Sequence, residues 1–240
     1  MAEQCDFYCL SYKNPERKEA MENRFEKLGI NIFIYPGVEF EDERIVGRKI
    51  QEQTKRTWSF TYGHFDNIRE FYFNSDKKYG IFCEDDIFIR KDFIEHLPQI
   101  IKNIEKMKLD MLLLGYLFKE KIEHNNEGFY LKEPDSTEEH PFSYYNYPNS
   151  VWGAQMYMLT REQAGILVEK YSPPYADFSL ENKTLTSFNA DWTFTKDGNR
   201  ALIYPMMAIE DGKTIYEDGG QHNFHIDCHK INYVKDLFYE

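Results

Sequence analysis

The sequence has few cysteines and no linker-like stretch. Its four cysteines, at positions 5, 9, 83 and 228, form no CxxC pair, so their spacing does not predict paired metal ligands. Cys9 and Cys83 lie inside apolar runs, where a buried free thiol is expected. No glycine- or serine-rich segment divides the 240 residues, so we expect a single domain over residues 1–240.

The chain also lacks an excess of basic residues and long apolar runs. It carries 29 Lys and Arg against 41 Asp and Glu, a net charge of -12, which is a poor match for nucleic acid. The first residues, MAEQCDFYCLSY, contain no basic region followed by an apolar stretch, and no window approaches about eighteen uninterrupted apolar residues. We therefore expect no signal peptide, no membrane span and a cytoplasmic protein, whose oligomeric state the sequence leaves undefined.

Aromatic residues, in contrast, make up 17% of the chain. Tyr144, Tyr145, Tyr147 and Trp152 lie close together in the sequence. Their rings could pack on the C–H groups of a pyranose, or they could belong to an aromatic-rich core.

Strands alternate with helices along the chain, which predicts an α/β fold. Residues 6–10 and 32–35 read as strands around a helix that Asn14 caps, with Pro15 at its first position and Gly29 beyond its end. Residues 38–58 read as a loop, with or without a short helix, and Thr61 is expected to cap the next helix. Alternation of this kind favours a mostly parallel sheet flanked by helices, with ligands at the carboxyl ends of the strands.

The later elements follow the same pattern. We expect strands at 80–83, 111–114, 154–159 and 202–204. A helix is expected near residue 92, where Pro98 argues against an unbroken helix and favours a kink or a late start. Thr160 and Gln163 form a predicted capping box. Residues 119–150 read as a variable surface excursion on the acceptor side, and residues 210–240 as an acidic, histidine-rich tail.

An acidic triplet, Glu84-Asp85-Asp86, stands where the predicted strand GIFC meets solvent. Three adjacent carboxylates repel one another, and a divalent cation such as Mn²⁺ or Mg²⁺ would offset that cost. Such a cation would also neutralise the charge that develops on a leaving diphosphate. The alternative is an acidic turn that caps the next helix.

A phosphate could bind where the first strand ends and the first helix begins, at Ser11 and Arg17. The alternative is that Arg17 is a plain surface residue.

The collinear order of several stretches resembles glycosyltransferase family 25. The stretches are LSYKNPERKEAM, YGHFDNIREF, YGIFCEDDIFI, VWGAQMYMLTREQAGILV, FNADWTF and ALIYP, which together span roughly residues 6–205. In the second of them, Gly63 stands where the family has serine.

This resemblance implies a GT-A fold, a UDP-sugar donor, dependence on manganese and inversion at the anomeric carbon. Asp86 would bind the metal, supported by Glu84. The implied donor-binding residues are Ser11, Arg17, His64 and Asp85, although His64 could equally be structural. Asp191 would be the general base, or alternatively a helix cap, and Trp152 would contact the acceptor.

The resemblance further implies one metal ligand from the C-terminal part of the chain. Asp211, Asp218, His222 and His225 are candidates, of which we take His222; a plain polar tail, or a zinc site that includes Cys228, is the alternative. The predicted function is transfer of galactose or glucose from a UDP-sugar to a glycan or protein hydroxyl. An inactive scaffold of the same fold and a metal-dependent nucleotidyltransferase are the competing hypotheses.

Overall fold

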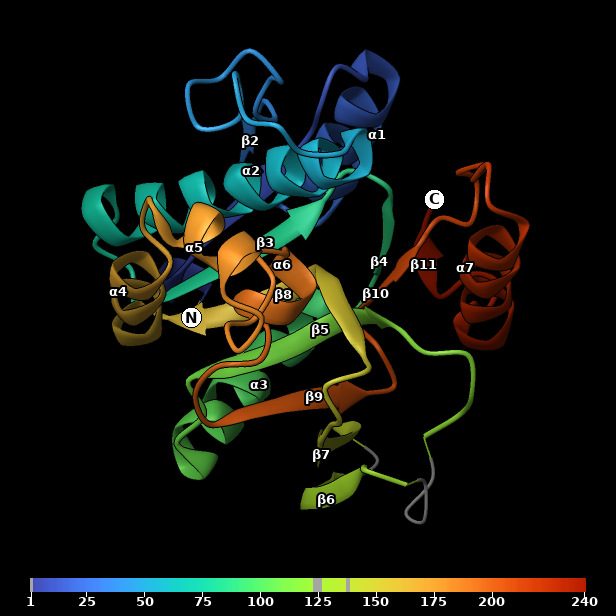
Figure 1. The fold of residues 1–240 in the computed structure, drawn as a ribbon. Coiled ribbons are helices and arrows are strands. Elements are labelled where there is room, and N and C mark those ends of the chain that lie inside the picture. Colours follow the sequence, from blue (N-terminus) through green and yellow to red (C-terminus); the bar gives the residue numbers. More distant parts are fainter. Residues whose placement is uncertain (1, 123–126, 137–138) are drawn as a thin grey trace.

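The computed structural model describes residues 2–122, 127–136 and 139–240. Its strands form one large sheet, in the order β2-β1-β3-β8-β5-β9-β7-β6, and one small sheet, in the order β10-β4-β11 (Figure 1). The strands are β1 (Cys5–Leu10), β2 (Ile32–Tyr35), β3 (Tyr79–Glu84), β4 (Ile87–Arg90), β5 (Met111–Leu117), β6 (Tyr130–Ser136), β7 (Pro141–Asn146), β8 (Trp152–Thr160), β9 (Arg200–Tyr204), β10 (Ala208–Glu210) and β11 (Phe238–Tyr239).

Helices flank the large sheet on both faces. They are α1 (Pro15–Lys27), α2 (Glu52–Asn74), α3 (Phe93–Met107), α4 (Arg161–Lys170), α5 (Tyr175–Glu181), α6 (Ala190–Thr193) and α7 (Gly219–Asn232), preceded by a short 3-10 turn at Ala2–Gln4. All strands of the large sheet run in the same direction except β7 and β8, which are antiparallel to their neighbours. The predicted α/β fold, with helices flanking a sheet in which most strands share one direction, is therefore confirmed.

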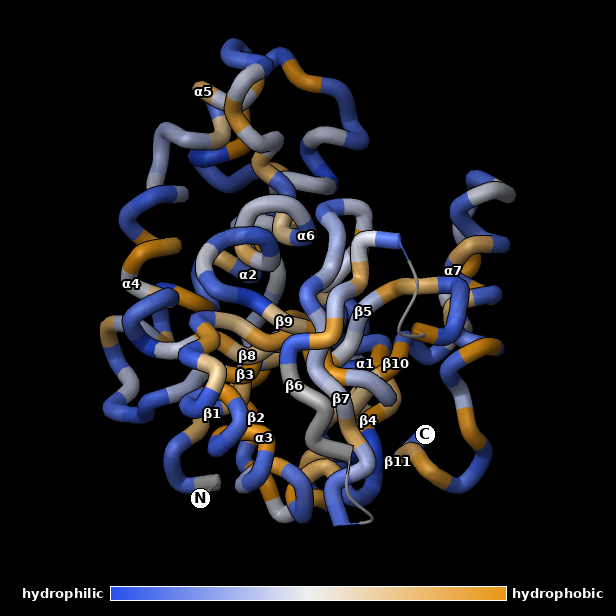
Figure 2. Tube along the Cα trace, turned by 90° about the horizontal axis from the view of Figure 1, so that it is seen from below, coloured by the Kyte–Doolittle hydropathy of each residue, from blue (hydrophilic) through white to orange (hydrophobic). Residues whose placement is uncertain are grey.

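Two hydrophobic clusters explain why both faces of the sheet are covered. Successive residues of β1 point to opposite faces, so Tyr8 packs against Phe71 of α2 while Phe7 packs against Phe25 of α1 and Phe93 of α3. The central strands accordingly read as continuous apolar runs, which Figure 2 shows as hydrophobic colour in the middle of the molecule and hydrophilic colour along its loops.

Several predicted boundaries are confirmed at their caps. The Asn14 side chain accepts a hydrogen bond from the Arg17 amide, Pro15 opens α1, and Gly29 follows the helix with φ +69°. Thr160 accepts a hydrogen bond from the Gln163 amide at 3.1 Å, although its own amide donates to Asp110 and the reciprocal half of the capping box is missing.

Other predictions about the elements were wrong. Helix α2 begins at Glu52 rather than at Thr61, whose buried hydroxyl instead donates to the Thr57 carbonyl inside the helix. Helix α3 runs without a break through Pro98. Its apolar side is buried against the sheet, and that packing outweighs the loss of one backbone hydrogen bond.

The two segments expected to be irregular are also folded where the structure describes them. Residues 119–150 contain β6 and β7, and β7 pairs with β9 at the edge of the large sheet, because Phe142, Tyr144 and Tyr145 bury their rings in the core. Residues 210–240 form α7 and β11 rather than a tail, and β11 pairs with β4. Among the helices of the described ranges, none has the length and apolar character needed to cross a bilayer.

Candidate active site

The site lies at the carboxyl ends of β1 and β3, which are parallel neighbours in register. Leu10 of β1 pairs with Glu84 of β3, so the residues that follow them, Ser11 and Asp85, emerge side by side. The Ser11 hydroxyl donates a hydrogen bond to Asp85 Oδ2 at 2.7 Å. Two motifs that are 74 residues apart in the sequence therefore meet at one edge of the sheet.

Arg17 joins this edge from the first turn of α1, where the Asn14 cap fixes the start of the helix. Its Nη1 atom lies 3.4 Å from Asp85 Oδ1 and 3.3 Å from Asp86 Oδ2. Its Nη2 atom donates to the Thr214 hydroxyl at 2.5 Å. The guanidinium thus partly neutralises two carboxylates and connects them to the loop after β10.

The acidic triplet lies where the chain leaves the large sheet and enters the small one through β4. Burial and the nearby Glu210 carboxylate raise the pKa of Asp86 to about 7, although Arg17 opposes the shift. Burial and the neighbouring carboxylates, first Asp86 and then Asp191, raise the pKa of Glu84 well above its usual range. A cluster of partly buried, ionised carboxylates costs free energy in the unliganded protein, and binding of a cation would offset that cost.

Glu210 is a member of the site that the sequence did not identify. It ends β10, pairs with Ile87 of β4 and so lies next to the acidic turn, while the Asp211 amide donates to the Asp86 carbonyl at 2.6 Å. Nδ1 of His225 lies 2.5 Å from Glu210 Oε2. A strand of three residues gives too weak a sequence signal to place a carboxylate against a motif more than a hundred positions away.

The histidine that faces the acids is therefore His225 and not the predicted His222. His222 lies half-exposed in the first turn of α7, one helical turn before His225, and contacts no acid of the cluster among the described residues. Asp218 caps α7 by accepting a hydrogen bond from the Gln221 amide at 2.7 Å. The alternative of a zinc site with Cys228 gains no support, because that thiol is buried and its pKa is raised to about 12.

The chemistry of the donor set fits a hard divalent cation. Glu84, Asp86 and Glu210 supply carboxylate oxygens only, and Asp86 Oδ1 is buried with no hydrogen-bond partner among the described residues. Within the described ranges, however, no three His, Cys, Asp or Glu side chains already converge as a ligand set. A cation could bind Asp86 Oδ1 and would compete with Arg17 for Asp86 Oδ2 alone.

Asp191 lies beside this cluster on α6. Its Oδ1 atom accepts hydrogen bonds from the backbone amides of Gly153 at 2.8 Å and Ala154 at 2.9 Å. Burial outweighs these bonds and raises the pKa of Asp191. The helix is capped by Asn189, whose side chain accepts from the Asp191 amide, so the alternative that Asp191 itself is the cap was wrong.

The predicted acceptor residue Trp152 is half-buried at the start of β8 and packs edge-on against Trp192, with ring centroids 5.3 Å apart. The other three rings of the aromatic group behave differently. Tyr144, Tyr145 and Tyr147 are at most 4% exposed and belong to the core.

His64, one of the predicted donor-binding residues, lies inside the molecule. Its side chain is completely buried, Nδ1 lies 3.0 Å from the Tyr157 hydroxyl, and burial lowers its pKa to about 3. The neighbouring Gly63 packs against the site strand, because a Cβ atom there would lie 2.6 Å from Leu10 Cδ1. A side chain at position 63 would therefore require Leu10 to move.

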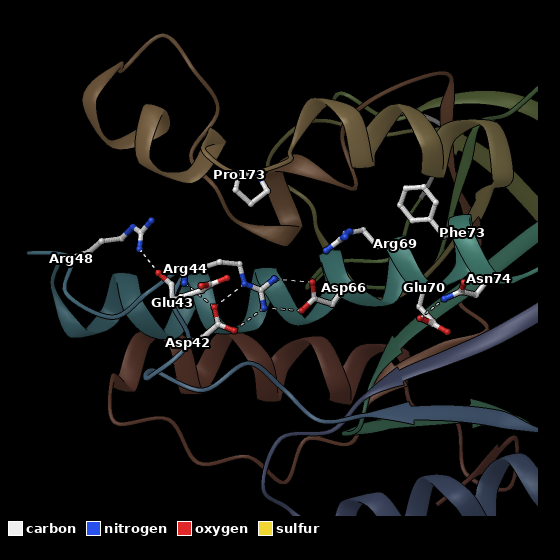
Figure 3. Close-up of a pocket in the computed structure, with 10 residues that line it drawn as sticks. All are labelled: Asp42, Glu43, Arg44, Arg48, Asp66, Arg69, Glu70, Phe73, Asn74 and Pro173. Atoms are coloured by element: carbon white, nitrogen blue, oxygen red, sulfur yellow. Dashed lines mark hydrogen bonds and ion pairs between the residues drawn. The ribbon is translucent and has the colours of Figure 1, made fainter.

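Two cavities lie near these elements. One of about 460 Å³ opens directly beside Ser11 and is lined by Leu10, Tyr12, Gly37, Phe40, Glu52, Arg56, Ser59 and Phe60. The other, of about 730 Å³, runs along α2 and shares no lining residue with the acidic cluster (Figure 3). In this second cavity Arg44 pairs with Asp42 and Asp66. Of the two cavities, the first adjoins the candidate active site, because Leu10 and Tyr12 on either side of Ser11 line it.

Residues 68–179 match the family model described as "Glycosyltransferase family 25 (LPS biosynthesis protein)". The match contains the acidic triplet and the segment around Trp152. Ser11, Arg17 and Asp191 lie outside it. No curated protein matches the chain.

Several solved structures are distantly similar. A197 from STIV has 13% identity and a TM-score of 0.42, with 83% of this chain and 81% of that chain covered. A glycosyltransferase involved in glycosylation of the major capsid of PBCV-1 has 12% identity and a TM-score of 0.40, over 92% and 98% of the two chains. A putative glucose-1-phosphate thymidylyltransferase from Bacillus anthracis has 9% identity and a TM-score of 0.39, over 97% and 98%. Similarity at this level does not identify an activity.

Proposed function

We propose that this chain, whose residues 68–179 match the model of glycosyltransferase family 25, transfers a hexose from a UDP-sugar to an acceptor hydroxyl with inversion. The single observation that carries the proposal is the convergence of Ser11, Arg17, Asp85 and Asp86 at the carboxyl ends of two parallel strands. In α/β sheets this edge is where nucleotide ligands bind.

The donor would lie across this edge. The cavity beside Ser11 contains two aromatic side chains, Tyr12 and Phe40, and can accept the flat uracil base. Ser11 and Asp85 would then lie near the ribose, and Arg17 would turn from the carboxylates towards the diphosphate, because a phosphate is the stronger partner for a guanidinium fork.

Glu84, Asp86 and Glu210 are the residues that would hold Mn²⁺ or Mg²⁺. When bound, the ion supplies positive charge next to the leaving diphosphate. Galactose and glucose remain the proposed sugars, from the family resemblance.

Asp191 would act as the general base. Both backbone hydrogen bonds described above end on Oδ1, so Oδ2 is the oxygen that takes the proton. The acceptor oxygen attacks the anomeric carbon as its proton moves to Asp191, and the bond from that carbon to the phosphate oxygen breaks with its electron pair leaving on UDP. The raised pKa makes the carboxylate a better base than an ordinary aspartate.

Calorimetric titration of UDP tests the donor site. We expect binding in the presence of Mn²⁺ and none after EDTA is added. A matched titration with ADP controls for unspecific nucleotide binding. Absence of UDP binding in both conditions would contradict the proposal and favour the inactive scaffold.

Product analysis tests the competing chemistry. With UDP-galactose or UDP-glucose, transfer releases UDP, and hydrolysis without an acceptor releases UDP and free sugar. A nucleotidyltransferase would instead release a sugar phosphate when pyrophosphate is added. That product would refute the assignment.

A further inference from the structure

Three half-buried aromatic side chains from three different elements meet beside the candidate active site. Trp152 begins β8, Trp192 lies on α6 and Phe224 lies on α7. The Trp152 ring centroid is 5.3 Å from that of Trp192 and 6.1 Å from that of Phe224. The chain has only three tryptophans, and the third, Trp58, is 1% exposed in the core. The rings of Trp152, Trp192 and Phe224 are all partly exposed, which distinguishes them from the buried aromatic rings of the core.

Each of these rings is the sequence neighbour of a residue that belongs to the acidic site. Trp152 precedes Gly153, whose amide binds Asp191, and Trp192 directly follows Asp191. Phe224 precedes His225, which binds Glu210. We term these three rings the aromatic platform, and each belongs to a residue that is adjacent in the sequence to a residue of the site.

The rings do not stack face to face. The planes of Trp152 and Trp192 meet at 85° and those of Trp152 and Phe224 at 52°, so they form a corner. Polar groups adjoin this corner, because His225 Nε2 is buried without a hydrogen-bond partner among the described residues, and its ring centroid is 6.4 Å from that of Trp152.

A pyranose matches this combination. It presents a face of C–H groups that can pack on an indole ring, and its rim carries hydroxyl groups that can bond to the polar atoms beside the platform. A cationic side chain fits less well, because the Lys196 amine already lies 5.8 Å from the Trp192 ring centroid. We infer that Trp152, Trp192 and Phe224 bind a hexopyranosyl residue of the acceptor, so that the acceptor is a glycan rather than a hydroxylated peptide. This inference rests on the proposed function.

The test compares Trp192→Ala with Trp192→Phe in transfer from the UDP-sugar to acceptors of defined chemistry. The acceptors are lactose, the methyl glycosides of glucose and galactose, and a peptide that contains hydroxylysine. We expect transfer to a glycoside and a KM for it that rises about tenfold in Trp192→Ala, the loss expected when one face of a sugar is no longer covered. The phenylalanine variant should recover most of this loss.

Phe73→Ala is the matched control, because Phe73 is an exposed aromatic residue in the cavity of Figure 3 and away from the platform. It should leave the KM unchanged. Transfer to the peptide alone, or an unchanged KM in Trp192→Ala, would overturn the inference.

Two further readouts keep this inference distinguishable from the proposed function. The UDP dissociation constant of Trp192→Ala should stay within about twofold of the wild type, since the platform holds acceptor and not donor. Titration of lactose into the free wild-type protein should change its tryptophan fluorescence, and Trp192→Phe should reduce that change. If UDP binds but no glycoside alters the fluorescence or acts as an acceptor, the role of the platform is refuted and the donor site is retained. If UDP does not bind, the proposed function itself is refuted.

Discussion

Replacing Asp191 separates its structural role from its chemical role. Asp191 Oδ1 accepts two buried backbone hydrogen bonds, from Gly153 and Ala154, while Oδ2 is the proposed proton acceptor. Asparagine keeps an oxygen for both amides but places an NH2 group where the proton would go. Alanine removes the oxygen from both amides.

The two variants should therefore differ in stability by a measurable amount. A buried amide without a partner costs roughly 1–3 kcal/mol, so Asp191→Ala should lose about 2 kcal/mol or more of the free energy of unfolding. For a chain of this length that is a fall in Tm of at least about 4 °C. Asp191→Asn should stay within about 1 kcal/mol of the wild type, because it trades two charge-assisted bonds for neutral ones and removes the cost of a buried charge.

The catalytic effect should be large in both variants. General-base catalysis contributes about 10²–10⁴-fold, so transfer by Asp191→Asn should fall by that factor while UDP binding with Mn²⁺ is retained. Differential scanning calorimetry gives the Tm, and UDP release in the presence of an acceptor gives the rate. Full transfer by a stable Asp191→Asn protein would refute the role of general base.

Three further outcomes follow from the site and its surroundings. Asp86→Asn should abolish Mn²⁺-dependent UDP binding in calorimetry, and binding that persists would exclude Asp86 as a metal ligand. Its Tm should be unchanged or raised, because the substitution removes a carboxylate whose charge burial and Glu210 disfavour. His64 stays neutral in the folded state because burial lowers its pKa to about 3, whereas the unfolded state takes up a proton below about pH 6.5. Stability is therefore lost as the pH falls, by about 2 kcal/mol at pH 5, and the drop in Tm between pH 7 and pH 5 should be smaller in His64→Gln; equal drops would contradict this. Gly63→Ser should lower the free energy of unfolding in urea by about 1–3 kcal/mol, because the serine Cβ would contact Leu10. The serine should cost less in a Leu10→Ala background. An unchanged free energy of unfolding in Gly63→Ser would show that Leu10 moves freely.

The parts of the site that the sequence predicted are those set by local signals. The acidic triplet follows an apolar strand, and the cap at Asn14 fixes where Arg17 leaves the first helix, so both could be placed at the edge of a parallel sheet before any coordinates were known. Their meeting follows from strand register, which brings Ser11 to Asp85.

The parts that the sequence did not predict depend on tertiary pairing. Glu210 reaches the site through a strand of only three residues. The rotation of α7 about its axis places His225 rather than His222 against Glu210, and no sequence pattern in α7 predicts that rotation. The helix that starts at Glu52 has no side-chain cap, so its first turns are hidden in a polar stretch. Strands β6 and β7 lie in a turn-rich segment whose composition predicts a surface excursion, whereas pairing with β9 orders β7.

Strand β4 has a consequence for how the protein folds. It follows the acidic turn directly and lies between β10 and β11. Residues 87–90 can therefore form their strand pairs only after residues 208–210 and 238–239 are available. Pairings that distant in sequence close large loops and form late. A nascent chain that has not yet exposed residue 238 can already contain the strands of the large sheet and still lack a fixed acidic turn. The acidic turn should consequently become fixed only when β10 and β11 have paired with β4, so the geometry of the site depends on strands that are distant in the sequence.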